Sequence, residues 1–191
     1  MPIGIMSAMR EEIETLIHEL EVTEKVVRGM RSYYLGNLWG KEVVLVFSRW
    51  GKVASATTAT HMITDFEVSE ILFTGVAGAL DPKLEIGDVV IGDRMYQHDM
   101  DASPFVEPFE VPLLGKKYFE TNPERNQMLL EATSMFLSDL QNHFKSNEPD
   151  RFGITQPNNL LGAVASGDQF ISKESQIEKI GSELFELKSF F

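Results

Sequence analysis

Cysteine is absent from this sequence of 191 residues. Its absence excludes disulfide bonds and thiolate zinc sites, and it is compatible with a reducing compartment, so we expect a cytoplasmic protein. No uninterrupted apolar run approaches the roughly 20 residues of a membrane-spanning helix. The first residues lack a basic leader and reach Arg10, Glu11 and Glu12 before an apolar run attains signal length. We therefore expect no membrane partner.

Basic residues are scarce, with 17 Lys and Arg against 29 Asp and Glu, which gives a net charge of -12. Such a field repels phosphate backbones, so we expect no nucleic-acid partner. The GxGxxG and Walker patterns are also missing, which argues against a dinucleotide or triphosphate cofactor. Four scattered histidines have no ligand spacing, and His98 with Asp99 and Asp101 is the nearest approach to a metal cluster. We predict no metal and no cofactor.

A hydrophobic content of 43% in a chain of this length supports one sizeable core, and we expect a single domain over residues 1–191. Apolar periodicity alternates between the strand and helix types, which predicts an α/β fold with parallel pairing. We expect strands at residues 2–6, 26–38, 42–47, 71–74, 88–96 and 160–165, and helices at residues 10–20, 52–66 and 122–144 and from Ser172 onward.

The connections carry their own signals. Trp39, Gly40 and Lys41 suit a hairpin between two strands. Thr121 is the expected N-cap of the long helix, with Pro123 in its first turn. Residues 75–87 are loop-like, three prolines interrupt residues 104–112, and residues 147–159 form a polar segment that could include a short strand at 152–154.

Three turns of small residues each follow an apolar run, which is where ligands bind in open α/β sheets. Together they suggest one pocket, although any one of them alone is more simply a tight turn. The three turns are residues 7–9, 74–78 and 166–168.

Two glutamates and one aromatic residue follow such turns. Glu11 at the start of a helix is explained by dipole compensation, whereas Glu12 could also face a pocket as a general base. Phe170 could present an aromatic face to a base, although core packing is the commoner reason for an aromatic residue at such spacing.

Four ordered motifs resemble those of the 5'-methylthioadenosine/S-adenosylhomocysteine nucleosidases, from residue 3 to about residue 180. They are GIMSAMREE at residues 4–12, TGVAG at residues 74–78 followed by GDVV at residues 87–90, HDMD at residues 98–101, and SGDQFI at residues 166–171.

This resemblance implies a nucleoside phosphorylase-like three-layer α/β fold, with a central mixed, partly barrel-like sheet and pairing as a homodimer. It implies hydrolysis of the N-glycosidic bond between adenine and a 5'-thioribose, in methionine salvage. By resemblance, Glu12 is the water-activating base and Phe170 stacks on adenine. The remaining implied contacts are Ala8, Val76, Ala77 and Gly78 around the ribose and nucleophile, the main chain of Ile171 at the base edge, and Ala102 and Phe105 in a loop that closes the partner subunit's alkylthio pocket.

The chemistry requires these residue types. Adenine is a poor leaving anion, so an acid must protonate it while a base activates water on the opposite face of the sugar. Val76 stands where some relatives of the family have serine, so a hydroxyl contact is absent there. Asp168 matches a turn position whose role we regard as structural.

The resemblance fails from Glu183 onward, where the sequence reads ELFELKSFF. The family's ribose-binding glutamate and adenine-protonating aspartate have no counterpart in it. We therefore expect a C-terminally truncated nucleosidase domain that lacks the family's last strands and helix, with little turnover and with low stability or an altered assembly. A truncated product and a natural binding remnant are both compatible with this sequence.

Rival functions remain. One is a nucleosidase for another purine nucleoside such as futalosine or AMP, and another is a non-catalytic module that binds adenine nucleosides or dimerises. A phosphorylase is a third, but only Arg10 and Arg49 lie near the candidate turns, and Glu12 would repel a phosphate dianion.

Overall fold

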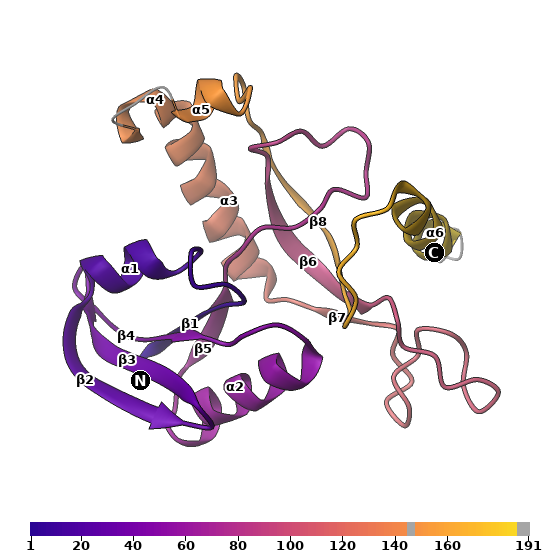
Figure 1. The fold of residues 1–191 in the computed structure, drawn as a ribbon, viewed down its shortest axis with the longest axis horizontal. Coiled ribbons are helices and arrows are strands. Elements are labelled where there is room, and N and C mark those ends of the chain that lie inside the picture. Colours follow the sequence, from indigo (N-terminus) through magenta and orange to yellow (C-terminus); the bar gives the residue numbers. More distant parts are fainter. Residues whose placement is uncertain (145–147, 187–191) are drawn as a thin grey trace. The chain divides into compact units, whose positions relative to one another are not determined.

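The computed structural model describes residues 1–144 and 148–186. The chain divides into two compact units, Met1–Ala77 and Gly78–Phe191, and each combines a sheet with helices (Figure 1). The expected mixed α/β class is confirmed. The described strands form two separate sheets of five and three strands, so a closed barrel is not formed among them.

The five-stranded sheet of the first unit has the order β2-β3-β4-β1-β5. Strand β1 lies between β4 and β5 and runs parallel to both, as the sequence pattern predicts, while β2, β3 and β4 form an antiparallel meander. The strands are β1 (Ile3–Ser7), β2 (Glu21–Arg28), β3 (Arg31–Leu38), β4 (Lys41–Phe47) and β5 (Glu70–Phe73).

Strand β4 is buried on both faces of this sheet. Val43 and Leu45 belong to one core cluster, and Val44 and Val46 belong to the other. Helix α1 (Glu14–Glu19) lies on one side and helix α2 (Lys52–Thr64) on the other (Figure 1). A continuous apolar strand thus becomes the middle of three layers because both of its faces are covered.

The single strand expected at residues 26–38 is wrong, because the chain reverses within it. Gly29 and Met30 both have positive φ, 51° and 62°, and Arg28 pairs with Arg31 across the turn. Two positive φ values in a two-residue loop match the right-handed twist of the flanking strands. The hairpin expected at Trp39 and Gly40 is confirmed, again with positive φ at both residues.

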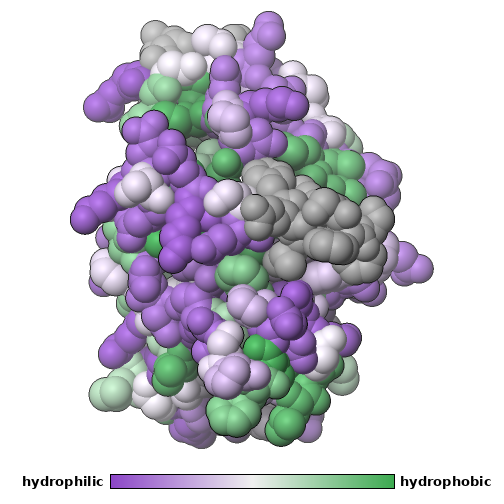
Figure 2. Space-filling model, turned by 90° about the vertical axis from the view of Figure 1, so that its right-hand side faces the viewer, coloured by the Kyte–Doolittle hydropathy of each residue, from purple (hydrophilic) through white to green (hydrophobic). Residues whose placement is uncertain are grey.

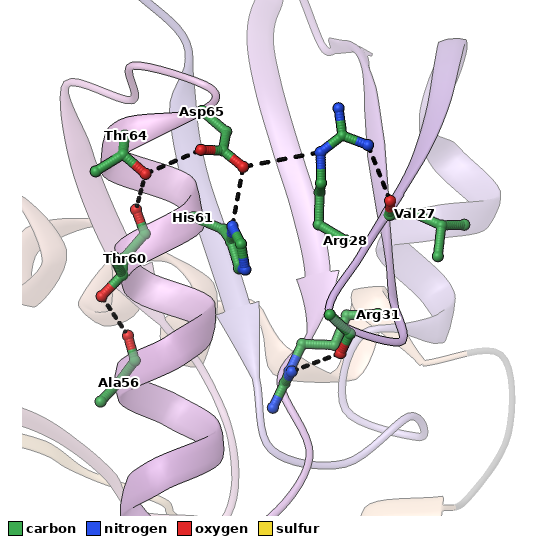
Figure 3. Close-up of polar contacts among 9 residues, drawn as sticks. Val27, Arg28, Arg31, Ala56, Thr60, His61, Thr64 and Asp65 are labelled. Carbon is green, nitrogen blue, oxygen red and sulfur yellow. Dashed lines mark hydrogen bonds and ion pairs between the residues drawn. The ribbon is translucent and has the colours of Figure 1, made fainter.

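The end of α2 is tied to the β2–β3 hairpin by a polar cluster (Figure 3). The carboxylate of Asp65 accepts a hydrogen bond from Nδ1 of His61 at 2.9 Å and lies 3.8 Å from Nε of Arg28. The hydroxyl of Thr64 donates to the same carboxylate at 3.0 Å. The hydrogen bond from His61, followed by that from Thr64, lowers the pKa of Asp65 below its ordinary value.

The cluster predicts a pH-dependent contribution to stability. A carboxyl whose pKa is lowered in the folded state stabilises the fold above its unfolded pKa of about 3.9, and loses that effect as the pH falls. Asp65→Asn is therefore expected to lower the melting temperature slightly near pH 7, and the difference from the parent chain is expected to shrink as the pH falls below about 3.9. Thermal unfolding of both chains across this range measures the difference. A difference in melting temperature that grows as the pH falls would contradict a stabilising role for the ionised Asp65.

The second unit is built on a three-stranded sheet of order β7-β6-β8. Strands β6 and β8 are parallel, and β7 is antiparallel to β6. The elements are β6 (Val89–Gln97), β7 (Tyr118–Glu120), α3 (Pro123–Ser138), α4 (Leu140–His143), α5 (Glu148–Arg151), β8 (Asn159–Ser166) and α6 (Glu174–Glu186).

Helix α3 is fixed to this sheet by polar side chains. The side-chain amide of Asn159 donates a hydrogen bond to the carbonyl of Leu130 at 2.6 Å, and the hydroxyl of Thr121 donates one to the carbonyl of Gly92 at 2.7 Å. Thr121 is therefore not the N-cap. Asn122 caps the helix instead by accepting from two backbone amides, and Pro123 occupies the first turn as predicted.

Two further expectations for this unit are wrong, and one strand was not expected. The single helix expected at residues 122–144 ends at Ser138, and a separate short helix begins at Leu140. The short strand considered at 152–154 is absent from the described residues, because the amide of Ile154 turns back to the carbonyl of Pro149. Strand β7 was not predicted, since it is only three residues long and follows a proline-rich segment. Residues 187–191, which belong to the expected C-terminal departure, lie outside the described residues.

Surface polarity agrees with the composition. Hydrophilic side chains dominate the face drawn in Figure 2, and apolar side chains interrupt it in separate patches. Within the described part of the chain, every helix is too short or too polar to cross a membrane.

Candidate active site

The parallel strands of the first unit bring three chain segments to one edge of its sheet. The amide of Ser48 donates to the carbonyl of Ser7 at 2.9 Å, and the amide of Thr74 donates to the carbonyl of Met6 at 3.0 Å. The carboxyl ends of β1, β4 and β5 therefore lie side by side. This edge is the usual ligand-binding edge of a parallel sheet.

The turn after β1 positions Glu12. The carbonyl of Arg10 accepts from the amides of Ile13 and Glu14, at 3.1 and 2.9 Å, and the side chain of Ile13 is completely buried. Helix α1 begins only at Glu14, so the expectation of a helix from Arg10 is wrong. Glu12 thus lies in the turn that precedes the helix, anchored by its buried neighbour.

Two backbone amides hold the carboxylate of Glu12. Oε2 accepts from the amide of Met9 and Oε1 accepts from the amide of Val76, both at 2.9 Å. The first amide belongs to the turn after β1 and the second to the segment after β5. The half-buried carboxylate therefore joins two of the predicted turns, and its orientation is fixed by both oxygens.

Neighbouring residues of the first unit leave this carboxylate accessible. Val76 is 81% exposed, Ala77 is exposed and Ala8 is half-buried, so small or outward-facing groups surround it. Glu11 is exposed on the same turn. A fixed carboxylate beside open space at a strand edge is suited to accept a proton from a small molecule.

The third turn belongs to the second unit and is held by the HDMD motif. The amide of His98 donates to the carbonyl of Ser166 at 3.0 Å, and the amide of Asp168 donates to Oδ2 of Asp99 at 2.8 Å. The imidazole of His98 lies directly against Gly167, where a Cβ atom would collide with it. His98 and Asp99 thus support the turn that precedes Phe170.

The segment after this turn presents one aromatic face and borders a groove. Phe170 is 90% exposed, whereas Ile171 is half-buried. Ile171 contributes to the wall of an open cavity of about 760 Å³ within the second unit. The cavity is lined by His98, Asp99, Met100, Asp101, Glu107, Pro108, Phe109, Lys117, Gln169, Ile171, Gln176, Lys179, Ile180 and Glu183.

The proline-containing segment that begins at HDMD carries Ala102 and Phe105. The amide of Phe105 donates to the carbonyl of Ala102 at 3.1 Å, and the Phe105 ring is 91% exposed. Ser103 donates its backbone amide to Oδ1 of Asp101 at 2.9 Å, which lowers the pKa of that carboxyl. The segment therefore holds an aromatic ring in solvent on a hydrogen-bonded turn.

The predicted site residues fall into two groups. Ala8, Glu12, Val76 and Ala77 lie in the first unit, where Glu12 is bonded to the amide of Val76. The second unit contains Gly78, Ala102, Phe105, Phe170 and Ile171. Their roles in substrate binding stay predictions.

Sequence reasoning missed two contributors to the Glu12 geometry. They are the amide of Met9 and the bare Cα of Gly75, against which the carboxylate lies. A glycine just after a strand was the only signal for the second.

The model of the phosphorylase superfamily matches residues 2–186, almost the whole chain. The chain belongs to the phosphorylase superfamily. Within this superfamily it is similar to nucleosidases. It is 32% identical over 180 residues to the aminodeoxyfutalosine nucleosidase of Campylobacter jejuni, a match that covers 94% of this chain and 70% of that protein. It is 34% identical over 179 residues to the 5'-methylthioadenosine/S-adenosylhomocysteine nucleosidase of Staphylococcus epidermidis, covering 93% and 70%.

Solved structures confirm the fold expected of this superfamily member. The Neisseria meningitidis 5'-methylthioadenosine/S-adenosylhomocysteine nucleosidase in complex with methylthio-immucillin-A superposes with a TM-score of 0.80 at 28% identity, covering 97% of this chain and 72% of that chain. The Helicobacter pylori enzyme of the same name, in complex with a pyrrolopyrimidine compound, gives a TM-score of 0.76 at 32% identity, covering 96% of this chain and 72% of that chain. The predicted resemblance to this nucleosidase family is confirmed.

Proposed function

We propose that the chain hydrolyses the N-glycosidic bond of 5'-methylthioadenosine and S-adenosylhomocysteine, which releases adenine and the thioribose in methionine salvage. The similarity of the chain to nucleosidases supports the general reaction, which is hydrolysis of a nucleoside. The single observation that carries the proposal is the carboxylate of Glu12, held by the amides of Met9 and Val76 at the carboxyl edge of a parallel sheet.

Glu12 is the proposed general base. Each carboxylate oxygen has a further lone pair after it has accepted its backbone hydrogen bond, so the group can still accept a hydrogen bond from water. As the glycosidic bond breaks, water attacks the sugar carbon and gives its proton to Glu12. The departing adenine must also gain a proton, and because the family's aspartate has no counterpart in this sequence, we propose that a solvent water molecule donates it and that turnover is correspondingly slow.

The proposed substrate-binding roles belong to the residues that the sequence predicted for the site. Phe170 is proposed to stack on adenine, because an almost fully exposed ring can offer its whole face to a planar base. The main chain of Ile171 is proposed to bond the base edge. Ala8, Val76, Ala77 and Gly78 are proposed to line the ribose and the nucleophile, where small side chains permit close backbone approach.

A homodimer is also proposed, with Ala102 and Phe105 closing the partner subunit's alkylthio pocket. The exposed face of α2 supports pairing, because it carries no charged side chain. The hydroxyls of Thr57 and Thr60 bond to helix carbonyls at 2.8 Å, so they need no solvent partner. This face consists of Val53, Ala56, Thr57, Thr60 and Ile63.

Ile63→Ala tests the dimer surface. Ile63 is 58% exposed in the single chain, and truncating it removes apolar area that pairing would bury. Each of the two protomers would lose about 1–2 kcal/mol of burial, so the dimer Kd is expected to rise roughly 30- to 1,000-fold. Sedimentation equilibrium measures the Kd, with Val27→Ala on β2 as the matched exposed control. An unchanged Kd for Ile63→Ala would remove α2 from the interface.

A second substrate class is favoured by the similarity to the aminodeoxyfutalosine nucleosidases of Campylobacter jejuni and Helicobacter pylori. The deciding experiment follows purine release from methylthioadenosine, adenosylhomocysteine and aminodeoxyfutalosine, with and without inorganic phosphate. We expect adenine release from the two thioethers at a rate independent of phosphate. Exclusive cleavage of aminodeoxyfutalosine would replace the substrate assignment, and adenine binding without turnover would favour the non-catalytic alternative.

A further inference from the structure

We infer that Gly75 is a positioning residue whose missing side chain lets Glu12 occupy its catalytic orientation. This inference rests on the proposed function of Glu12. Gly75 lies two residues beyond the end of β5 and directly before Val76, whose amide binds the carboxylate.

The space beside Gly75 is filled by the carboxylate itself. A Cβ atom on Gly75 would lie 2.8 Å from Oε1, 3.0 Å from Cδ and 3.1 Å from Oε2 of Glu12. Real Cβ atoms essentially never approach another heavy atom closer than 3.0 Å. Glu12 therefore packs against the bare Cα of Gly75 with its whole carboxylate plane.

Backbone conformation does not explain the glycine. The φ of Gly75 lies outside the left-handed region, unlike that of Gly29 at 51°. An alanine could adopt the same backbone without strain. The requirement for glycine at this position therefore comes from the carboxylate beside it.

The carboxylate of Glu12 cannot move away from a Cβ atom on Gly75 without weakening a hydrogen bond. Both of its oxygens are bonded at 2.9 Å, one to Met9 and one to Val76, so a shift away from a Cβ atom would lengthen at least one of these bonds. A base displaced by about 1 Å can lose roughly 10²-fold in rate. Gly75 thus controls where the proton acceptor lies.

Gly75→Ala is the direct test, in the full chain. We expect kcat for methylthioadenosine to fall about 10²-fold while KM changes less than about threefold, because the base and not the binding surface moves. Gly181→Ala in α6 is the matched control, because a Cβ there would meet nothing within 4 Å. It is expected to retain the parent kcat.

A second readout does not depend on turnover. Amide hydrogen exchange at Met9 and Val76 reports their bonds to Glu12, and we expect faster exchange at both in Gly75→Ala but not in Gly181→Ala. A melting-temperature loss caused by Gly75→Ala should also disappear in the Glu12→Ala background, because no carboxylate remains to collide.

The outcomes separate the two proposals. A parent chain without nucleosidase activity would overturn the proposed function, while altered exchange in Gly75→Ala would still support positioning. Parent activity with unchanged kcat and unchanged exchange in Gly75→Ala would overturn positioning alone. An equal melting-temperature loss with and without the Glu12 carboxylate would also overturn it.

Discussion

Glu12→Gln is expected to lower kcat for methylthioadenosine by about 10²–10⁴, the usual contribution of a general base. Glutamine preserves the size of the side chain and can still accept one of the two backbone hydrogen bonds. It cannot take a proton from water at neutral pH, so the loss should appear mainly in kcat, beside a loss of about 1 kcal/mol in stability for the one backbone hydrogen bond that glutamine cannot accept. Steady-state adenine release and thermal unfolding, measured on the same preparation, separate the two effects.

Glu11→Gln is the control for this prediction, because it makes the same chemical change on the adjacent, exposed residue. We expect its kcat to stay within about twofold of the parent value, as for surface substitutions remote from the chemistry. Equal losses in both variants would mean that the acidity of the turn, and not the position of Glu12, supports the rate.

Phe170→Ala is expected to weaken binding of the adenine moiety. Stacking of a base on an aromatic side chain contributes about 1–3 kcal/mol, which corresponds to a Kd raised roughly 5- to 150-fold. The ring is 90% exposed, so its removal leaves no core cavity and the melting temperature should be nearly unchanged. Calorimetric titration with adenine measures the Kd directly.

Phe152→Ala serves as the comparison, because Phe152 is another largely exposed phenylalanine of the same unit. Its removal is expected to leave adenine binding unchanged. If Phe170→Ala bound adenine as tightly as the parent, the ring would have no part in base recognition, and the wall around Ile171 would become the better candidate.

The pattern of apolar runs predicted β1, β4 and β5 of the first unit, but it merged β2 and β3 into one strand. β1 and β4 are continuous apolar runs buried on both faces, and such runs identify themselves in a sequence. The β2–β3 turn escaped notice because Gly29 and Met30 interrupt an otherwise strand-like stretch for only two residues. Positive φ at a methionine leaves no compositional trace.

Local ambiguity explains the errors in the second unit. Thr121 and Asn122 are both good N-caps, and the choice between them depends on the carbonyl of Gly92, which is distant in sequence and receives the Thr121 hydroxyl. Strand β7 exists because β6 offers a pairing edge to Tyr118 and its neighbours. Both the carbonyl of Gly92 and strand β6 are distant in sequence from the residues that they bind, so local sequence patterns do not reveal them.

The candidate base could be located from sequence, but the groups that bind its carboxylate could not. Glu12 was identified by its place after a strand and by resemblance. The amides of Met9 and Val76 are backbone groups that every residue possesses, and only the fold shows that they point at one carboxylate. The close fit of Gly75 against that carboxylate is likewise a three-dimensional fact.

The most direct test of the account follows the oxygen that reaches the sugar. The parent chain and Glu12→Gln are incubated with methylthioadenosine in ¹⁸O-enriched water containing inorganic phosphate, and the sugar product is analysed by mass spectrometry. With the parent chain, we predict methylthioribose that carries one ¹⁸O atom taken from water. With Glu12→Gln, we predict that methylthioribose forms at least about 10²-fold more slowly. Formation of methylthioribose 1-phosphate, or equal rates from both chains, would contradict the role of Glu12 as the base that activates water.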